Sequence, residues 1–309
     1  MILFHCTWHD KTKWLNSIKK TFTNYKIYTI YNCTNFSKIK YAIIWQLPDK
    51  YLKKLNNIEL IFSLGAGVDH IISLPSYNKT PIIRLKDQLM AERMSNHIIS
   101  QVLNYQLNLK LYYEMQKKKK WINFLNPIFN KDCTIGIIGI GFLGKSVAES
   151  LLKLGYNVQG FKRTQPLKKC KFKVYYQKRY LKNFLKTSNI VLLVLPNTSD
   201  TLNFVNKQFL SYMKSDSLLI NVGRGSSINE DDLFTHMKRN KNFHASLDVF
   251  KKEPLPKKSK LWNLKNVIIT PHVASITVID SAVQYYYKTL KKINKSKKVR
   301  SDVDINRGY

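Results

Sequence analysis

Three polar residues in the second half of the chain have the types and positions needed to transfer a proton beside a bound carboxylate. Arg224 lies between Gly223 and Gly225 at the end of an apolar run, where its planar guanidinium could bind a carboxylate and a neighbouring carbonyl oxygen. His272 follows another apolar run, and Glu253 precedes it in the chain. A carboxylate beside His272 would favour the protonated imidazole, which could donate a proton to a carbonyl oxygen as hydride reaches the carbon. Arg224, Glu253 and His272 are therefore the predicted catalytic residues.

A glycine-rich turn predicts a dinucleotide site. Gly139, Gly141 and Gly144 form a G-x-G-x-x-G pattern directly after the apolar run 134–138 and before a helical pattern. Such glycines allow a tight turn, close approach of the pyrophosphate and close helix packing, while the helix N-terminus faces the phosphates. An ordinary strand-to-helix turn is the alternative, and it is disfavoured because four of the chain's 11 glycines lie between positions 136 and 144.

The residues after the next predicted strand favour NADP over NAD. The usual fingerprint has an acidic residue about 20 positions further on, which binds the adenosine ribose of NAD. This chain has Lys162, Arg163 and Thr164 there, and no Asp or Glu occurs between Glu149 and Asp200. A basic cluster can hold the 2′-phosphate of NADP through charge-assisted hydrogen bonds. A lysine-rich composition would also place basic residues here, but it explains Lys162 more easily than the missing carboxylate.

Short apolar runs alternate with amphipathic stretches along the chain. Strands are predicted at 2–7, 27–31, 42–45, 60–64, 82–85, 134–138, 157–161, 190–195, 218–222, 244–249 and 267–270. Helical periodicity separates most of them, and long helices are expected at about 91–117 and 278–293. This alternation predicts the α/β class, with parallel sheets covered by helices on both faces.

A length of 309 residues fits two domains of roughly 150 residues each. We predict a substrate domain formed by residues 1–95 with 276–309, and a dinucleotide-binding domain formed by residues 96–275. Each is expected to be a doubly wound parallel sheet.

The motifs together resemble the D-2-hydroxyacid dehydrogenase family. Its members have the glycine fingerprint, an R-G loop, a D-V-F-x-x-E-P segment (here 248–254) and a P-H motif (here 271–272) in this order. The resemblance covers essentially the whole chain and implies a flavodoxin-like substrate domain and a Rossmann NAD(P)-binding domain. Segments 64–69, 195–198 and 306–309 are most similar to the NADPH-dependent reductases of small 2-keto acids within this family.

The resemblance implies a role for each predicted site residue. Arg224 would orient the substrate carboxylate, His272 would donate the proton and Glu253 would hold His272. The substrate would also contact Trp45, Ala66 and Gly67. The implied cofactor-binding residues are Gly139, Gly141, Phe142, Leu143, Gly144, Lys162, Arg163, Thr164, Leu195, Pro196, Val222, Gly223, Asp248 and Ser275.

The implied reaction is the NADPH-dependent reduction of glyoxylate to glycolate and of hydroxypyruvate to D-glycerate, by a homodimer without a metal. Two alternatives stay open: a related dehydrogenase acting on another 2-keto acid, and a non-catalytic protein of the same fold that senses dinucleotides. One departure from the family is Gly223, which stands where alanine is usual before the arginine and which we expect to loosen the loop slightly.

The net charge of +33, from 52 Lys and Arg against 19 Asp and Glu, would ordinarily suggest a nucleic-acid partner. The basic residues are spread along the whole chain, and the abundance of Lys, Asn and Ile fits mutational drift in an AT-rich genome, so we do not expect nucleic-acid binding. The longest apolar stretch, 134–144, is shorter than the roughly 20 residues of a membrane span. The N-terminus lacks a signal-peptide pattern, which favours a cytoplasmic protein.

Overall fold

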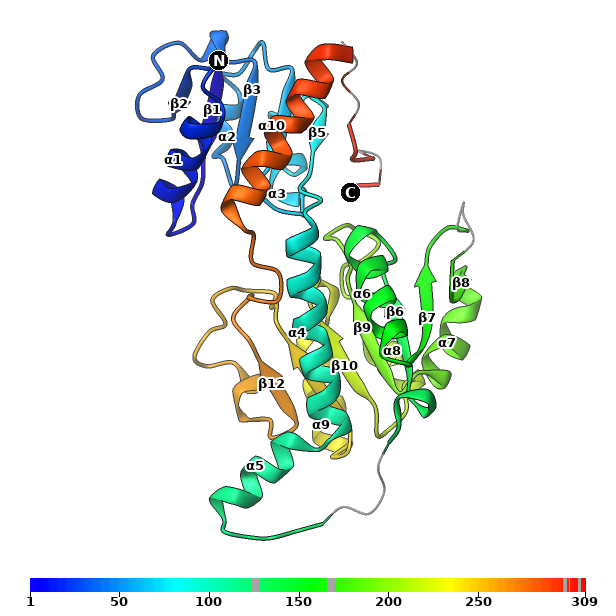
Figure 1. Cartoon of the computed structure of the whole chain (residues 1–309). Coiled ribbons are helices and arrows are strands. Elements are labelled where there is room, and N and C mark those ends of the chain that lie inside the picture. Colours follow the sequence, from blue (N-terminus) through cyan, green and yellow to red (C-terminus); the bar gives the residue numbers. More distant parts are fainter. Residues whose placement is uncertain (124–127, 166–169, 297–298, 300, 305–306) are drawn as a thin grey trace. The chain divides into compact units, whose positions relative to one another are not determined.

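The computed structural model describes residues 1–123, 128–165, 170–296, 299, 301–304 and 307–309 (Figure 1). Position 306, part of the terminal motif, lies outside the described residues. The chain divides into two compact units: a first unit of Met1–Met90, Pro196–Thr198 and Thr277–Tyr309, and a second unit of Ala91–Leu195 and Ser199–Ile276. The domain bounds at 95/96 and 275/276 stay a prediction. None of the helices that the structure describes is long and apolar enough to cross a membrane.

The first unit contains a parallel sheet with the strand order β2-β1-β3-β4-β5. Its strands are β1 (Ile2–His5), β2 (Ile27–Thr29), β3 (Tyr41–Ile44), β4 (Leu60–Ser63) and β5 (Ile82–Ile83). Its helices are α1 (Lys11–Thr21), the 3-10 turn η1 (Phe36–Lys38), α2 (Asp49–Leu52), α3 (Asp69–Ile72) and α10 (Ile279–Ser296). This is the flavodoxin-like order that the resemblance implied.

Burial on both faces explains why the central strands of the first unit are continuous apolar runs. Every residue of β4 is buried, and α1 packs beside α10. Trp14 and Ile18 form the buried face of α1, and Tyr286 of α10 is fully buried against the sheet. The Tyr286 hydroxyl donates a hydrogen bond of 2.7 Å to the backbone oxygen of Ser63 at the end of β4.

The second unit contains a seven-stranded parallel sheet with the order β12-β11-β10-β9-β6-β7-β8. Its strands are β6 (Thr134–Ile138), β7 (Asn157–Lys162), β8 (Lys173–Tyr176), β9 (Ile190–Leu193), β10 (Leu218–Asn221), β11 (His244–Leu247) and β12 (Val267–Ile269). The strand order reverses between β6 and β9. Open α/β sheets bind ligands at such a switch point, outside the carboxyl ends of the strands.

Helices cover both faces of this sheet. They are α4 (Gln88–Gln106), α5 (Leu109–Lys117), α6 (Phe142–Lys153), α7 (Leu181–Thr187), α8 (Lys207–Tyr212) and α9 (Glu230–Arg239), with 3-10 turns η2 (Asn130–Asp132), η3 (Lys178–Tyr180), η4 (Gly225–Ser227) and η5 (Lys260–Asn263). Alternate strand residues enter opposite cores. Ile190 and Leu192 join the cluster under α4 and α6, whereas Val191 and Leu193 join the cluster under α7, α8 and α9.

The structure corrects two expectations about local structure. The helix expected at 91–117 is two helices, because Asn108 adopts a left-handed conformation (φ 55°) between α4 and α5. Strand β8 was not predicted, since its lysine and tyrosines are at least partly exposed and form no apolar run. It forms because β7 offers a free edge for backbone pairing.

Candidate active site

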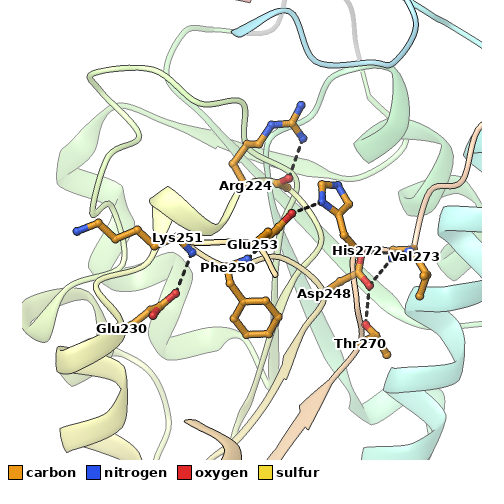
Figure 2. A network of polar contacts seen from close by, with 11 residues as sticks. Arg224, Glu230, Asp248, Phe250, Lys251, Glu253, Thr270, His272 and Val273 are labelled. Atoms are coloured by element: carbon orange, nitrogen blue, oxygen red, sulfur yellow. Dashed lines mark hydrogen bonds and ion pairs between the residues drawn. The ribbon is translucent and has the colours of Figure 1, made fainter. Parts of the chain in front are cut away.

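The three predicted catalytic residues lie on loops that begin side by side. Asn221, Leu247 and Ile269 end β10, β11 and β12 and occupy neighbouring positions in the sheet register. Arg224, Glu253 and His272 follow these strand ends within a few residues each. Figure 2 shows the three side chains grouped at this edge. Parallel strands bring their carboxyl ends to one edge, so residues far apart in the chain meet there.

Glu253 and His272 form the central pair. Glu253 Oε2 lies 2.7 Å from His272 Nδ1, and Glu253 Oε1 accepts a hydrogen bond of 2.9 Å from the Phe250 N–H. Burial raises the pKa of Glu253, but the hydrogen bonds from His272 and Phe250 and the charges of His272 and Arg224 outweigh burial and lower the pKa below its usual value. The carboxylate therefore stays ionised and can stabilise an imidazolium.

The loop that carries His272 is held by Asp248. This buried carboxylate accepts hydrogen bonds from Thr270 Oγ1 (2.5 Å), the Val273 N–H (2.9 Å) and the Ala274 N–H (3.0 Å). His272 itself has a positive φ of 56°, which costs a non-glycine residue free energy. Its N–H donates to the Asp248 backbone oxygen at 2.8 Å, so Asp248 fixes the strained residue with both its side chain and its backbone.

The arginine loop is fixed by the buried Asn221. Asn221 Nδ2 donates to the Arg224 backbone oxygen (3.1 Å), and Asn221 Oδ1 accepts from the Gly223 N–H (3.1 Å). Arg224 Nη1 donates to the Gly223 backbone oxygen at 3.0 Å. The half-buried guanidinium is thereby held near the Glu253–His272 pair (Figure 2).

The structure gives Gly223 a packing role that the sequence did not show, and the expectation that it loosens the loop stays a prediction. A Cβ at Gly223 would lie 2.6 Å from the Leu195 backbone nitrogen and 2.7 Å from its oxygen. The glycine permits close packing of the arginine loop against the segment after β9, so it fits the loop tightly to its neighbour.

Sequence reasoning missed three supporting residues: Asn221, Glu230 and Thr270. Glu230 Oε1 accepts from the Lys251 N–H at 2.9 Å and so anchors the segment between β11 and Glu253 (Figure 2). Asn221 and Thr270 lie inside the motifs that contain Arg224 and His272, and their position at strand ends was the available signal. Glu230 carries no such signal, because it contacts Lys251 only through the fold.

The glycine turn has the shape that a dinucleotide phosphate requires. Gly139 has a φ of 102°, and a Cβ there would lie 2.4 Å from the Val194 oxygen. A Cβ at Gly144 would lie 2.1 Å from the Gly139 oxygen, so both glycines are needed for the turn itself. A Cβ at Gly141 would meet no atom within 4 Å. No side chain caps the N-terminus of α6, where Phe142 and Leu143 begin the helix, and the open space at Gly141 fits an approaching anion.

The predicted 2′-phosphate residues follow directly at the end of the neighbouring strand. Lys162 ends β7, and Arg163 and Thr164 are exposed after it. The Gly139 N–H donates to the Phe161 backbone oxygen, which places this strand end beside the glycine turn. Arg163 forms an ion pair with Asp200, a contact that sequence reasoning did not anticipate.

The other residues that we predicted to bind the cofactor lie in the same unit, except for Pro196. Val222 follows β10, Leu195 follows β9, and Ser275 follows the His272 loop. Pro196 groups with the first unit. Among the described residues, no three His, Cys, Asp or Glu side chains are placed to hold a metal ion.

The predicted substrate residues Trp45, Ala66 and Gly67 lie in the first unit, on the loops after β3 and β4. These strands are adjacent and parallel, so the two loops share an edge of that sheet. Their contact with a substrate stays a prediction.

Comparison with known proteins gives a consistent family. Residues 99–274 match the model of the D-isomer specific 2-hydroxyacid dehydrogenase, NAD binding domain. The chain is 33% identical to the glyoxylate/hydroxypyruvate reductase A of Escherichia fergusonii, with 100% of this chain and 99% of the relative covered.

Solved structures agree over the full length. A D-isomer specific 2-hydroxyacid dehydrogenase from Xanthobacter autotrophicus in complex with NADPH and MES is 27% identical with a TM-score of 0.92. An NADPH-dependent glyoxylate/hydroxypyruvate reductase from Sinorhizobium meliloti in complex with NADP and sulfate is 26% identical with a TM-score of 0.92. Each similarity covers 100% of this chain and 99% of the other.

Proposed function

The chain belongs to the D-isomer specific 2-hydroxyacid dehydrogenase family, and from this premise we propose that it reduces small 2-keto acids, glyoxylate and hydroxypyruvate above all, with NADPH. The observation that carries the proposal is the 2.7 Å contact between Glu253 Oε2 and His272 Nδ1 beside the Arg224 loop. A proton donor and a carboxylate-binding cation at one sheet edge are the groups that this reduction needs.

Each side chain has one role in the proposed reaction. Arg224 binds the substrate carboxylate through its planar guanidinium and polarises the carbonyl. His272 Nε2 donates the proton to the carbonyl oxygen, because Nδ1 is engaged with Glu253. Glu253 stabilises the imidazolium before this transfer. NADPH, when bound, supplies the hydride.

The glycine turn and the end of β7 would hold the cofactor. Gly141 and the N-terminus of α6 are suited to the pyrophosphate, and Lys162, Arg163 and Thr164 to the 2′-phosphate. The preference for NADP is supported by the absence of an acidic residue at the end of β7 and by relatives crystallised with NADP or NADPH. A cytoplasmic location is part of this proposal.

We also propose a homodimer. Helix α5 projects from the sheet of the second unit (Figure 1), and large apolar side chains are exposed on it and just after it, among them Leu109, Tyr113 and Trp121. A second copy of the chain would cover them. Sedimentation of the wild type and of Tyr113→Glu tests this: a dimer that the variant converts to monomer supports the proposal, and a monomeric wild type contradicts it.

A steady-state panel of small 2-keto acids with NADPH and NADH tests the catalytic proposal. Turnover of glyoxylate and hydroxypyruvate with NADPH at the highest kcat/KM would support it. Higher efficiency with a different 2-keto acid would assign a sister activity. Cofactor binding without turnover of any 2-keto acid would favour a dinucleotide sensor instead.

A further inference from the structure

A chain of hydrogen bonds links the two predicted substrate loops of the first unit. The hydroxyl of Ser63, the last residue of β4, is fully buried and donates to the Gly67 backbone oxygen at 2.7 Å. His70 Nε2 lies 3.1 Å from the same hydroxyl oxygen. The Gln46 N–H donates to His70 Nδ1 at 3.1 Å. His70 thereby joins the loop after β3 to the loop after β4.

The chemistry of the partners fixes the direction of every bond. The Gly67 carbonyl can only accept, so the single proton of Ser63 is used there. The Ser63 oxygen must then accept from His70 Nε2–H. The Gln46 backbone N–H can only donate, which makes Nδ1 the acceptor. His70 is therefore the neutral tautomer with its proton on Nε2. A carboxamide side chain likewise carries a donor and an acceptor on two separate atoms.

The same imidazole contacts Trp45. The centroids of the two rings are 4.2 Å apart, with an angle of 48° between the planes. The indole also fills the space that a side chain at Gly65 would need, since a Cβ there would lie 2.8 Å from Trp45 Cζ3. The position and tilt of the Trp45 indole are thus set by two contacts, one with the His70 ring and one with Gly65.

We propose that His70 is a positioning residue that sets the spacing between Trp45 and the Gly67 loop and so determines how tightly a small 2-keto acid binds. The inference rests on the proposed function and on the substrate contacts of Trp45, Ala66 and Gly67 that the family resemblance implies. His70 acts through its neighbours: it orders the Gly67 peptide through Ser63 and the backbone after Trp45 through Gln46.

A purely structural role for His70 makes a different prediction. In that case its loss would lower the melting temperature and leave the KM of the remaining folded enzyme unchanged. A positioning role raises the KM for the keto acid while the KM for NADPH stays constant. Comparison of the two KM values therefore separates the roles.

Four variants make this test specific. His70→Phe keeps a ring against Trp45 and removes both hydrogen bonds of the imidazole. Ser63→Ala removes the hydroxyl that links His70 to the Gly67 backbone oxygen. His70→Gln restores a donor and an acceptor, so it is the rescue variant. Tyr286→Phe is the matched control. It removes a 2.7 Å hydrogen bond to the backbone oxygen of Ser63 and leaves the hydrogen bonds of His70 and of the Ser63 hydroxyl in place.

We expect His70→Phe and Ser63→Ala to raise the KM for glyoxylate about 3- to 10-fold, the effect of losing a positioning hydrogen bond, with the KM for NADPH within about 2-fold of wild type. His70→Gln should recover most of this loss, and Tyr286→Phe should lower the melting temperature alone.

Wild-type KM values in folded His70→Phe and Ser63→Ala would overturn the inference and leave the proposed function intact. An increase in the KM for glyoxylate in Tyr286→Phe as large as that in His70→Phe would do the same. If His70→Phe does not fold, Ser63→Ala and His70→Gln decide by the same criterion. A wild type that turns over no 2-keto acid would overturn the proposed function, and the inference with it.

Discussion

Gly225 lies against Phe250 so closely that a Cβ on the glycine would be 1.9 Å from the Phe250 carbonyl carbon and 2.1 Å from its oxygen. This contact brings the loop of Arg224 against the segment that leads to Glu253. The glycine after the arginine is therefore a packing requirement, and it allows the loop of Arg224 to lie against the segment that carries Glu253.

Gly225→Ala should destabilise the protein and impair catalysis together. Overpacking against backbone costs roughly 1 to 3 kcal/mol or more, because a backbone cannot move aside as a side chain can. Thermal unfolding and kcat/KM measure the two effects. Gly141→Ala is the control for unfolding, since a Cβ there meets no atom within 4 Å and should leave the melting temperature unchanged. Equal melting temperatures for the two variants would show that the Gly225 contact is not needed.

Replacing His272 by Gln should lower kcat by roughly 10² to 10⁴, the usual contribution of a positioned general acid. The glutamine keeps a polar side chain but cannot donate a proton to the product alkoxide. NADPH affinity, followed by the cofactor's fluorescence on binding, should stay close to wild type. Wild-type turnover would remove His272 from the mechanism.

Replacing Arg224 by Lys should lower kcat/KM by about 10²-fold or more, because an ammonium keeps the charge and loses the planar fork. The loop itself should remain in place, since Asn221 holds it through backbone atoms. Arg239→Lys, at the exposed end of α9, is the matched control and should have no effect. An Arg224→Lys enzyme with full efficiency would show that the guanidinium does not bind the carboxylate.

The pH profile of reduction should depend on Glu253. Its lowered pKa keeps the Glu253–His272 pair charged as the pH falls, until the pH drops below the ordinary glutamate range near about 4.3. Glu253→Gln removes the group that titrates in this acid range and leaves a neutral side chain beside His272 Nδ1. The low-pH limb that Glu253 contributes to kcat/KM should therefore disappear in this variant, and kcat/KM at neutral pH should fall because the proton donor loses its charged partner. An unchanged low-pH limb together with wild-type kcat/KM at neutral pH would mean that the 2.7 Å contact does not act on the proton donor.

Cofactor preference should depend on Arg163 and on its ion-pair partner Asp200. Arg163→Ala should raise the KM for NADPH roughly 10- to 100-fold and leave NADH almost unchanged, because a charge-assisted contact to phosphate is lost. Asp200→Asn should act in the opposite direction and lower the KM for NADPH about 2- to 5-fold, the range of an exposed ion pair that no longer competes. Lys162→Ala is expected to have a much smaller effect than Arg163→Ala. A preference for NADPH that survives in the Lys162→Ala, Arg163→Ala double variant would place the phosphate elsewhere.

The local sequence by itself determined most of the strands, the glycine turn and the types of residue at the candidate site. Buried parallel strands must be continuous apolar runs, so the predicted strands of both sheets were found within two residues of their ends. The glycine fingerprint needs the same few residues in every chain, since a φ of 102° at Gly139 is accessible mainly to glycine. Residue types also predicted the pair of Glu253 and His272 and the nearby Arg224, because few side chains can donate a proton or bind a carboxylate, and the structure places Glu253 2.7 Å from His272.

Only the tertiary structure decided which of the strands, loops and side chains contact one another. Edge strand β8 forms by pairing with β7 and not by its own pattern, and the break at Asn108 interrupts an apolar periodicity that continues across it. The role of Gly223 depends on the Leu195 backbone, and the Arg163–Asp200 pair joins residues on separate loops. The neutral tautomer of His70 follows from Ser63, Gly67 and Gln46 together. Each of these properties depends on contacts between residues that are not neighbours in the sequence. The local sequence around one residue does not specify which backbone atoms or charged groups the fold places beside it.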